Sequence, residues 1–198
     1  MRHAPVWIAV LAAVAVGAGA ALYERSREPL VLRAGTALPE PRALPDFALV
    51  DQAGRPFDRS RFEGRWTLIF TGFTHCPDVC PTTVALMAEL HRRVPRDDLQ
   101  WVFVSVDPER DTPDAVARYL AHFDTALVGA TGERAQMEKL TAGLGLAQVR
   151  NPGINGEYTV DHSTAFVLLD PDARLAGYFS APHARDALAA DLAALPRG

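Results

Sequence analysis

The two cysteines of the chain lie four positions apart, in His75-Cys76-Pro77-Asp78-Val79-Cys80-Pro81. They directly follow an apolar run of strand length, residues 66–72, and precede a predicted helix. Unsatisfied N–H groups at a helix N-terminus favour a thiolate. A separation of four residues in a turn leaves the α-carbons about 6 Å apart, within disulfide range. The pair could therefore form a disulfide or supply two ligands to one metal ion, the alternative being two buried structural thiols.

His162 is the candidate third ligand. It lies in Asp161-His162-Ser163-Thr164, between a glycine-bearing loop at 150–160 and an apolar strand. In a thioredoxin-like arrangement, the loop entering that strand faces the cysteine turn. Two thiolates and one imidazole form a soft ligand set that suits copper, Cu(I) especially, whereas structural zinc usually takes a fourth ligand. An ordinary loop histidine is the alternative interpretation.

The other ionisable neighbours have weaker assignments. His75 adjoins Cys76 and either tunes the thiolate or meets solvent. Asp161 either orients the His162 ring or caps the adjacent turn. The remaining histidines are at the N-terminus or are expected at the surface, beside helices: His3, His91, His122 and His183.

The pattern of apolar runs and turn residues predicts the elements that would position these groups. Strands are expected at 47–51, 66–72, 99–107 and, weakly, 126–130, with a hairpin of strands 164–169 and 174–179. Helices are expected at 81–94, 113–123, 133–144 and 184–195. Residues 150–160 are expected to form a loop. Alternating strands and helices followed by a hairpin and a helix predict an α/β fold, a thioredoxin-like central sheet flanked by helices.

The predicted start of the first helix depends on one proline. Pro81 suits the first helical position because its missing N–H would be unpaired there in any case. The segment from Cys76 to Val79 is then expected to be an irregular turn that leads into the helix.

The start of the chain predicts an exported protein. Residues 6–23 contain no charge and are just long enough to cross a bilayer core. They form either a transmembrane anchor, with residues 1–5 in the cytoplasm, or a signal peptide cleaved near Ala18-Gly19-Ala20. A proline-rich linker is expected at 24–45, and the thioredoxin-like domain at 46–198. Both alternatives place that domain in the periplasm of a bacterium, at the inner membrane if the segment is an anchor.

Length and composition exclude several classes. The 198 residues suffice for one domain of about 150–170 residues and a short additional segment. Two cysteines exclude a disulfide-rich scaffold and a four-cysteine zinc site. The net charge is −4, and because residues 1–28 contribute +1, the remainder carries −5. This charge disfavours nucleic-acid binding.

The sequence resembles the SCO/SenC family, membrane-anchored copper proteins that serve cytochrome c oxidase assembly. The resemblance covers about residues 38–195 and includes an entry strand, Leu44–Phe47 with Asp51 and Gly54. Three further blocks carry it: Thr71–Pro81, Ser105–Pro113, and Asp161-His162 followed by a strand and Asp170-Pro171. The resemblance implies that Cys76, Cys80 and His162 bind copper. It also implies delivery of that copper to the dinuclear centre of oxidase subunit II, or reduction of that subunit's cysteines.

Two functions therefore compete, a copper metallochaperone without turnover and a thiol–disulfide oxidoreductase that uses the same cysteines. Both are compatible with one protein, because a dithiol must be reduced before it binds copper. Other copper chaperones or thioredoxin-like reductases are then expected as further partners. Thiol peroxidase activity ranks lowest, because it needs only one reactive thiolate and leaves His162 without a role.

Overall fold

The computed structural model describes residues 29–154 and 157–197, together with residues 8, 10–12, 14 and 17. The chain divides into two compact units, Met1–Leu30 and Val31–Gly198. The predicted anchor or signal segment at 6–23 lies largely outside the described residues. Within the part that the structure describes, no helix has both the length and the apolar character needed to span a membrane. The following description concerns the second unit.

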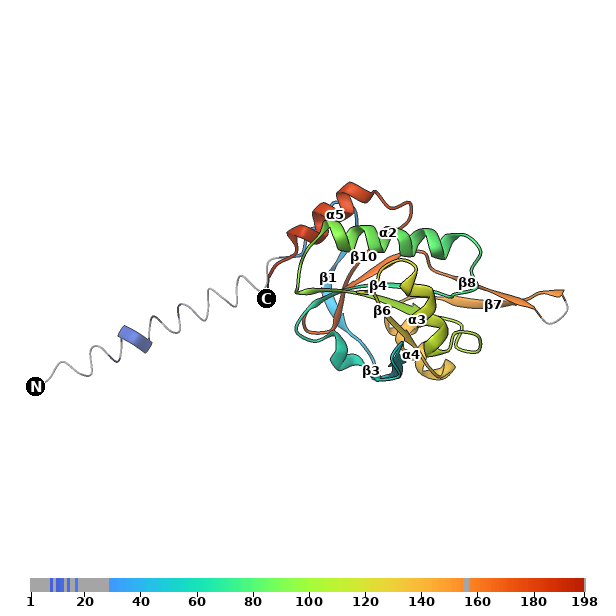
Figure 1. Ribbon diagram of the computed structural model, residues 1–198. Helices are drawn as coiled ribbons and strands as arrows, with labels where there is room; N and C mark the ends of the chain where they lie inside the picture. Colours follow the sequence, from blue (N-terminus) through green and yellow to red (C-terminus); the bar gives the residue numbers. More distant parts are fainter. Residues whose placement is uncertain are drawn as a thin grey trace, which may run out of the picture. The chain divides into compact units, whose positions relative to one another are not determined.

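A mixed sheet of eight strands forms the centre of this unit, in the order β1-β10-β9-β4-β5-β6-β2-β3 (Figure 1). The strands are β1 (Thr36–Ala43), β2 (Ala48–Asp51), β3 (Pro56–Asp58), β4 (Trp66–Gly72), β5 (Leu99–Ser105), β6 (Val128–Thr131), β9 (Phe166–Leu169) and β10 (Arg174–Phe179). Strands β4, β5 and β6 are parallel, and β9 runs antiparallel to β4. All residues of β4 and β9 are buried, as expected for central strands covered on both faces.

Helices cover both faces of the sheet (Figure 1). On one face lie α2 (Val79–Arg93) and α5 (Arg185–Ala194), and on the other lie α3 (Pro113–Ala121) and α4 (Arg134–Gly143). A 3-10 helix, η1 (Arg59–Phe62), precedes β4. Thr112 caps α3, accepting the N–H of Ala115, and Pro113 opens the helix as the sequence predicts. The predicted order of βα units, hairpin and closing helix is confirmed.

The sheet begins earlier than the sequence indicated. Residues 36–43 lie in the stretch assigned to a linker, yet they form β1, which pairs antiparallel with β10. Strand β1 lies at the edge of the sheet, where one side needs no ladder hydrogen bonds and proline is tolerated. Its register shifts between Ala37 and Arg42, the interval that contains Pro39 and Pro41. The prolines therefore interrupt an edge strand rather than prevent it.

The predicted loop at 150–160 is also wrong, because most of it belongs to a second hairpin. Strands β7 (Gln148–Pro152) and β8 (Tyr158–His162) pair antiparallel and form a separate two-stranded sheet. This hairpin extends beyond the body of the unit (Figure 1). The composition of this segment does not indicate strands, because asparagine, proline and glycine are rare inside them. It carries His162 at its last position.

Candidate metal centre

Cys76 lies in the loop that follows β4, and Cys80 lies in the first turn of α2. The helix begins at Val79, two residues earlier than predicted, so Cys80 is helical and Pro81 is the third residue of the helix. Asp78 occupies the capping position, but its side chain makes no capping hydrogen bond. Instead, the N–H of Cys80 donates to the sulfur of Cys76 at 3.4 Å. The Cys76 thiol therefore satisfies one of the N–H groups that a helix start leaves unpaired.

His162 reaches the cysteines from the end of β8. Its Nε2 lies 3.2 Å from Sγ of Cys80, and its Nδ1 donates to the carbonyl oxygen of Ser163 at 2.9 Å. Because a carbonyl can only accept, the proton of the neutral ring is on Nδ1, and Nε2 presents its lone pair to the cysteines. The rings of Phe70 and Phe73 contact the imidazole at centroid distances of 6.0 and 5.8 Å.

Asp161 does not orient this ring through a hydrogen bond, contrary to one of the two roles considered for it. Its carboxylate accepts from the side chain of Asn151 on β7 at 2.7 Å, so it serves the hairpin rather than the site. The Ser163 carbonyl takes the orienting role instead, a common second partner of metal-binding histidines.

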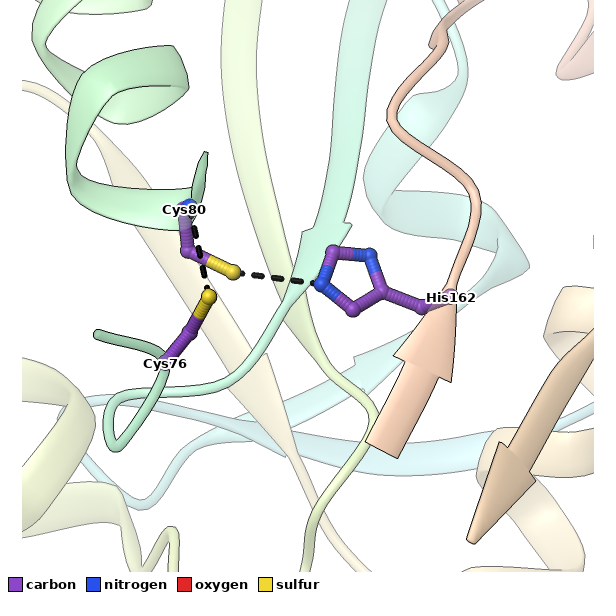
Figure 2. Close-up of side chains that lie close together, drawn as sticks. All are labelled: Cys76, Cys80 and His162. Atoms are coloured by element: carbon purple, nitrogen blue, oxygen red, sulfur yellow. Dashed lines mark hydrogen bonds between the residues drawn. The ribbon is translucent and has the colours of Figure 1, made fainter. Parts of the chain in front are cut away.

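The three predicted residues come together in the structure (Figure 2). Sγ of Cys76, Sγ of Cys80 and a ring nitrogen of His162 all lie within 4.8 Å of one another. Cys76 and His162 are partly exposed, and Cys80 is fully buried. Neither cysteine is in a disulfide. The geometry therefore offers a cluster of three possible metal ligands, in which one thiol is buried and the other is partly exposed.

Burial determines the protonation states of Cys80 and His162. It raises the pKa of the Cys80 thiol, and the hydrogen bond with Cys76 raises it further. The helix N-terminus predicted a favoured thiolate, but burial shifts the pKa of the Cys80 thiol in the opposite direction. Burial also lowers the pKa of His162, against a smaller opposing effect of the Ser163 carbonyl. At neutral pH, Cys80 is therefore a thiol and His162 is a neutral imidazole.

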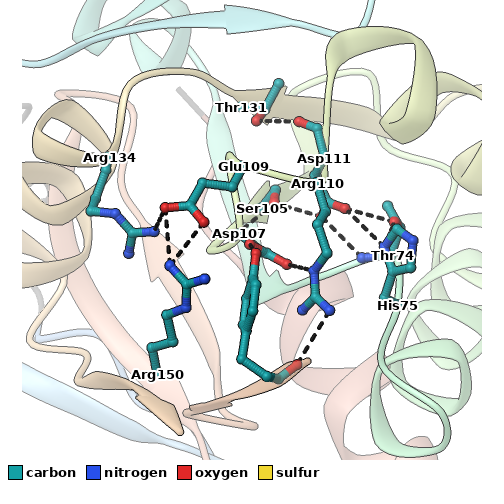
Figure 3. Close-up of polar contacts among 11 residues, drawn as sticks. Thr74, His75, Ser105, Asp107, Glu109, Arg110, Asp111, Thr131, Arg134 and Arg150 are labelled. Carbon is teal, nitrogen blue, oxygen red and sulfur yellow. Dashed lines mark hydrogen bonds and ion pairs between the residues drawn. The ribbon is translucent and has the colours of Figure 1, made fainter. Parts of the chain in front are cut away.

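A buried carboxylate holds the cysteine loop in place (Figure 3). Asp111 accepts from the N–H of Thr74 at 2.9 Å, from the Thr74 hydroxyl at 2.6 Å and from the Ser105 hydroxyl at 2.6 Å. Asp111 is completely buried, and these donors compensate for the hydration that it loses. His75 is exposed, and its Nδ1 faces Thr74 and Asp111 rather than the thiols. It is not part of the cluster formed by Cys76, Cys80 and His162.

Glycine at position 72 allows the buried thiol to pack against the end of β4. A β-carbon there would lie 3.1 Å from Sγ of Cys80 and 3.0 Å from the ring of Phe103. In the sequence, Gly72 is the last residue of a predicted strand, and nothing there indicates that it packs against a thiol. The available signals were its place inside the Thr71–Pro81 block and a glycine at a strand end, which indicates close backbone approach.

The other described histidines lie outside the cluster. His122 is exposed, as predicted. His91 is half-buried and pairs with Asp124 at 2.8 Å. His183 is also half-buried, so His91 and His183 both differ from their expected surface positions. Its ring packs on Phe166 at a centroid distance of 4.6 Å, and burial lowers its pKa.

Comparison with known proteins gives consistent matches. The family model SCO1/SenC matches residues 36–197. A candidate copper-binding protein from Stutzerimonas stutzeri is 41% identical over 154 residues, which cover 76% of each chain. The chain spans about half the length of the mitochondrial SCO2 homologues of cattle, mouse and human that it also matches, 53%, 54% and 52% respectively.

Solved structures share the fold. Copper-bound ScoI from Bradyrhizobium japonicum superposes with a TM-score of 0.70 at 38% identity, covering 76% of this chain and 97% of that one. BsSco, described as a member of the Sco family of cytochrome c oxidase assembly proteins with a disulfide switch, has a TM-score of 0.64 at 22% identity. That match covers 79% of this chain and 95% of BsSco, and at this identity it shows the fold alone. The predicted thioredoxin-like sheet flanked by helices is confirmed.

Proposed function

This chain belongs to the SCO1/SenC family, and we propose that it is a copper chaperone that binds one ion through Cys76, Cys80 and His162 and passes it to a partner. The observation that carries this proposal is the convergence of two sulfurs and one ring nitrogen within 4.8 Å. These atoms come from segments more than eighty residues apart in the sequence, since 82 positions separate Cys80 from His162.

The donor set fits copper better than zinc. Thiolates are soft ligands that select Cu(I), and imidazole also suits Cu(II). In the described part of the chain, the cluster includes no fourth histidine, cysteine or carboxylate, which a structural zinc site would usually need. The apolar rings of Phe70 and Phe73 beside the imidazole would limit the access of water.

The protonation states define how the site loads. The thiols must lose their protons when the metal binds, so loading releases protons and strengthens as the pH rises. Nε2 of His162 already presents a lone pair, because Nδ1 donates to Ser163. Cys76 is the more accessible thiol, and ligand exchange with a partner would therefore begin there.

The partner proposed is the dinuclear copper centre of cytochrome c oxidase subunit II. The support is the membership of a family described as one of oxidase assembly proteins. Thioredoxin-like reductases would supply the reducing equivalents, and other copper chaperones would supply the copper. Mixing the copper-loaded protein with the soluble copper domain of subunit II and following the dinuclear absorption band tests the transfer. Retention of copper by this chain would contradict it.

Three variants test the site. His162→Ala is expected to weaken Cu(II) binding at least tenfold and to change the Cu(II) absorption spectrum, because the imidazole completes a set that two thiolates leave open. Cys76→Ser should abolish binding. The matched control is His122→Ala, which removes an exposed imidazole outside the cluster. Wild-type affinity and spectrum in His162→Ala would contradict the three-ligand site.

The second candidate function is thiol–disulfide exchange, favoured by the accessible Cys76 beside the buried Cys80. In this reaction the Cys76 thiolate attacks a partner disulfide, a mixed disulfide forms, and Cys80 displaces the reduced partner thiol. Two protein thiols become one disulfide, and one partner disulfide becomes two thiols. His162→Ala is expected to leave this exchange nearly intact, whereas either cysteine variant should abolish it. Mass spectrometry after alkylation of air-oxidised protein should detect no free thiol.

We propose that residues 6–23 place this domain in the bacterial envelope, as an inner-membrane anchor or a cleaved signal. The support is the uncharged stretch of eighteen residues. Fractionation of cells that express the full chain should recover the protein with the inner membrane. A soluble periplasmic form that begins near Ala21 would establish a cleaved signal instead.

A further inference from the structure

Tyr158 is held between two arginines at the start of β8, the strand that carries His162. The guanidinium carbon of Arg110 lies 3.9 Å from the centre of the Tyr158 ring, and that of Arg150 lies 3.5 Å from it. The Tyr158 hydroxyl donates to the buried carboxylate of Asp107 at 2.6 Å. Both faces and the polar end of this side chain are therefore engaged. We call Tyr158, Arg110, Arg150 and Asp107 the tyrosine clamp.

Arg110 links the clamp to the cysteine loop. Its Nε donates to Asp107, and its Nη1 donates to the backbone carbonyl of Tyr158 at 3.2 Å. The same guanidinium lies 5.6 Å from the centre of the Phe73 ring, which in turn contacts the His162 ring. A single side chain thus contacts both the strand that bears the imidazole and the loop that bears the thiols.

The second arginine is fixed from outside the hairpin. Arg150 pairs with both carboxylate oxygens of Glu109, at 3.0 and 2.8 Å, and Arg134 of α4 pairs with the same carboxylate at 2.6 Å. Glu109, Arg110 and Asp111 are consecutive, and Asp111 holds Thr74 beside the cysteines. One short loop after β5 therefore fixes the hairpin and the cysteine loop relative to each other.

The hairpin depends on such side-chain contacts for its position. Strand β8 is hydrogen-bonded to β7 and is not a strand of the main sheet. Alternation along β8 places Tyr158, Val160 and His162 on one face. Val160 is 8% exposed, so this face is the one that packs on the unit. A displacement of Tyr158 would therefore also displace His162, because both residues lie on the same face of the short strand β8.

We propose that Tyr158 is a positioning residue that keeps the His162 imidazole against the two thiols and so supports Cu(II) more than Cu(I). The inference rests on the proposed copper function. Cu(I) is well served by thiolates alone, whereas Cu(II) gains more from an imidazole ligand. Loosening the clamp should therefore weaken Cu(II) binding selectively and raise the reduction potential of the bound copper.

The test compares Tyr158→Leu with two other tyrosine variants of the full chain. Tyr158→Leu is expected to weaken Cu(II) binding about tenfold and Cu(I) binding less than threefold, and a tenfold loss confined to Cu(II) corresponds to a rise of about 59 mV. Tyr158→Phe keeps a ring between the guanidinium groups and should stay within threefold of wild type. Tyr178→Leu is the matched control, because Tyr178 donates its hydroxyl to the Leu144 carbonyl and is outside the clamp and the ligand cluster. It should lower the melting temperature without changing the Cu(II) to Cu(I) affinity ratio.

A readout without metal accompanies the titrations. In the reduced, metal-free protein, Tyr158→Leu should accelerate amide hydrogen exchange in 148–152 and 158–162 at least tenfold relative to the main sheet, and Tyr178→Leu should not. Unchanged exchange together with an unchanged affinity ratio would overturn the clamp, provided that His162→Ala weakens Cu(II). If His162→Ala also binds Cu(II) like wild type, the proposed ligand set fails instead. Unchanged exchange with a changed affinity ratio would likewise overturn positioning through the hairpin.

Discussion

The two C-terminal hairpins of this protein are adjacent in sequence but are stabilised in opposite ways. Hairpin β9–β10 lies inside the main sheet, and every residue of β9 is buried. Hairpin β7–β8 forms its own two-stranded sheet, and Val149 and Ile154 are 56% and 83% exposed. The first therefore contributes to the stability of the fold, whereas the second carries His162, the proposed ligand. Fold stability and site geometry should be separable by mutation.

The buried hairpin is closed by its own turn. Asp170 accepts from the N–H groups of Asp172 and Arg174 at 3.0 and 2.9 Å and from Nε of Arg174 at 2.9 Å. The turn between β2 and β3 repeats this arrangement, with Asp51 accepting from Ala53 and Arg55. In the exposed hairpin, by contrast, Tyr158 is held by side chains of the loop that follows β5. Arg110 of that loop lies 48 positions before Tyr158 in the sequence. Local interactions define one hairpin, and long-range contacts position the other.

The largest expected effect comes from the buried hairpin. Leu168 is completely buried in β9, and Leu168→Ala should lower the free energy of unfolding by about 3 kcal/mol, because it removes apolar contacts and leaves a cavity. Chemical denaturation of the reduced, metal-free protein measures this change. The ratio of Cu(II) to Cu(I) affinity should stay unchanged at a temperature where the variant is folded. A large change in that ratio would show that stability and site geometry are coupled.

The second-largest effect on the free energy of unfolding is expected at the turn between β9 and β10. Asp170→Ala removes the acceptor of two backbone N–H groups and of Nε of Arg174, and we expect a loss of about 2 kcal/mol in the free energy of unfolding. Asp172→Ala is the control, because Asp172 pairs with the same Arg174 at 2.7 Å but is 73% exposed. Such surface pairs contribute about 0–1 kcal/mol. Equal losses in the two variants would contradict the role assigned to the turn.

His183, which is hydrogen-bonded to the Thr164 carbonyl just before β9, should make the free energy of unfolding depend on pH. Burial lowers the pKa of His183, while its hydrogen bond to the Thr164 carbonyl opposes that shift. Below a pH of about 6.5 the unfolded chain binds a proton that the folded state resists, so stability falls as the pH decreases through this range. In the metal-free protein, His183→Asn should make the decrease in stability with falling pH shallower. Part of the remaining slope comes from His162, because burial also lowers the pKa of that residue. His122→Asn is the control, and an unchanged slope in His183→Asn would refute the prediction.

The smallest effect is expected at the exposed hairpin. Ile154→Ala and Val149→Ala should change the free energy of unfolding by less than about 0.5 kcal/mol, because both side chains are largely in solvent. Denaturation under the conditions used for Leu168→Ala makes the comparison direct. A loss above 1 kcal/mol in either variant would mean that the hairpin contributes to the stability of the unit.

Local patterns in the sequence predicted most of the fold. Apolar runs defined the central strands β4 and β5 with the correct start and an error of at most two residues at the end. Thr112-Pro113 defined the start of α3, and Asp170-Pro-Asp-Ala173 indicated the β9–β10 turn. Each of these features depends on interactions within a few residues, so a short window of sequence contains the necessary information. The edge strand β1 and the hairpin β7–β8 were missed because their partners are distant or their composition resembles a loop.

The sequence by itself also determined which groups could act. The spacing of Cys76 and Cys80 and the position of His162 before a central strand made these residues candidates, the family resemblance implied that they act together, and the fold brings them together. Only the tertiary structure decided how those groups behave. Burial, which depends on the whole core, raises the pKa of Cys80 against the effect of the helix N-terminus. Contacts between segments far apart in the chain, through Asp111 and the tyrosine clamp, set the distance between the thiols and the imidazole, and no local pattern encodes them.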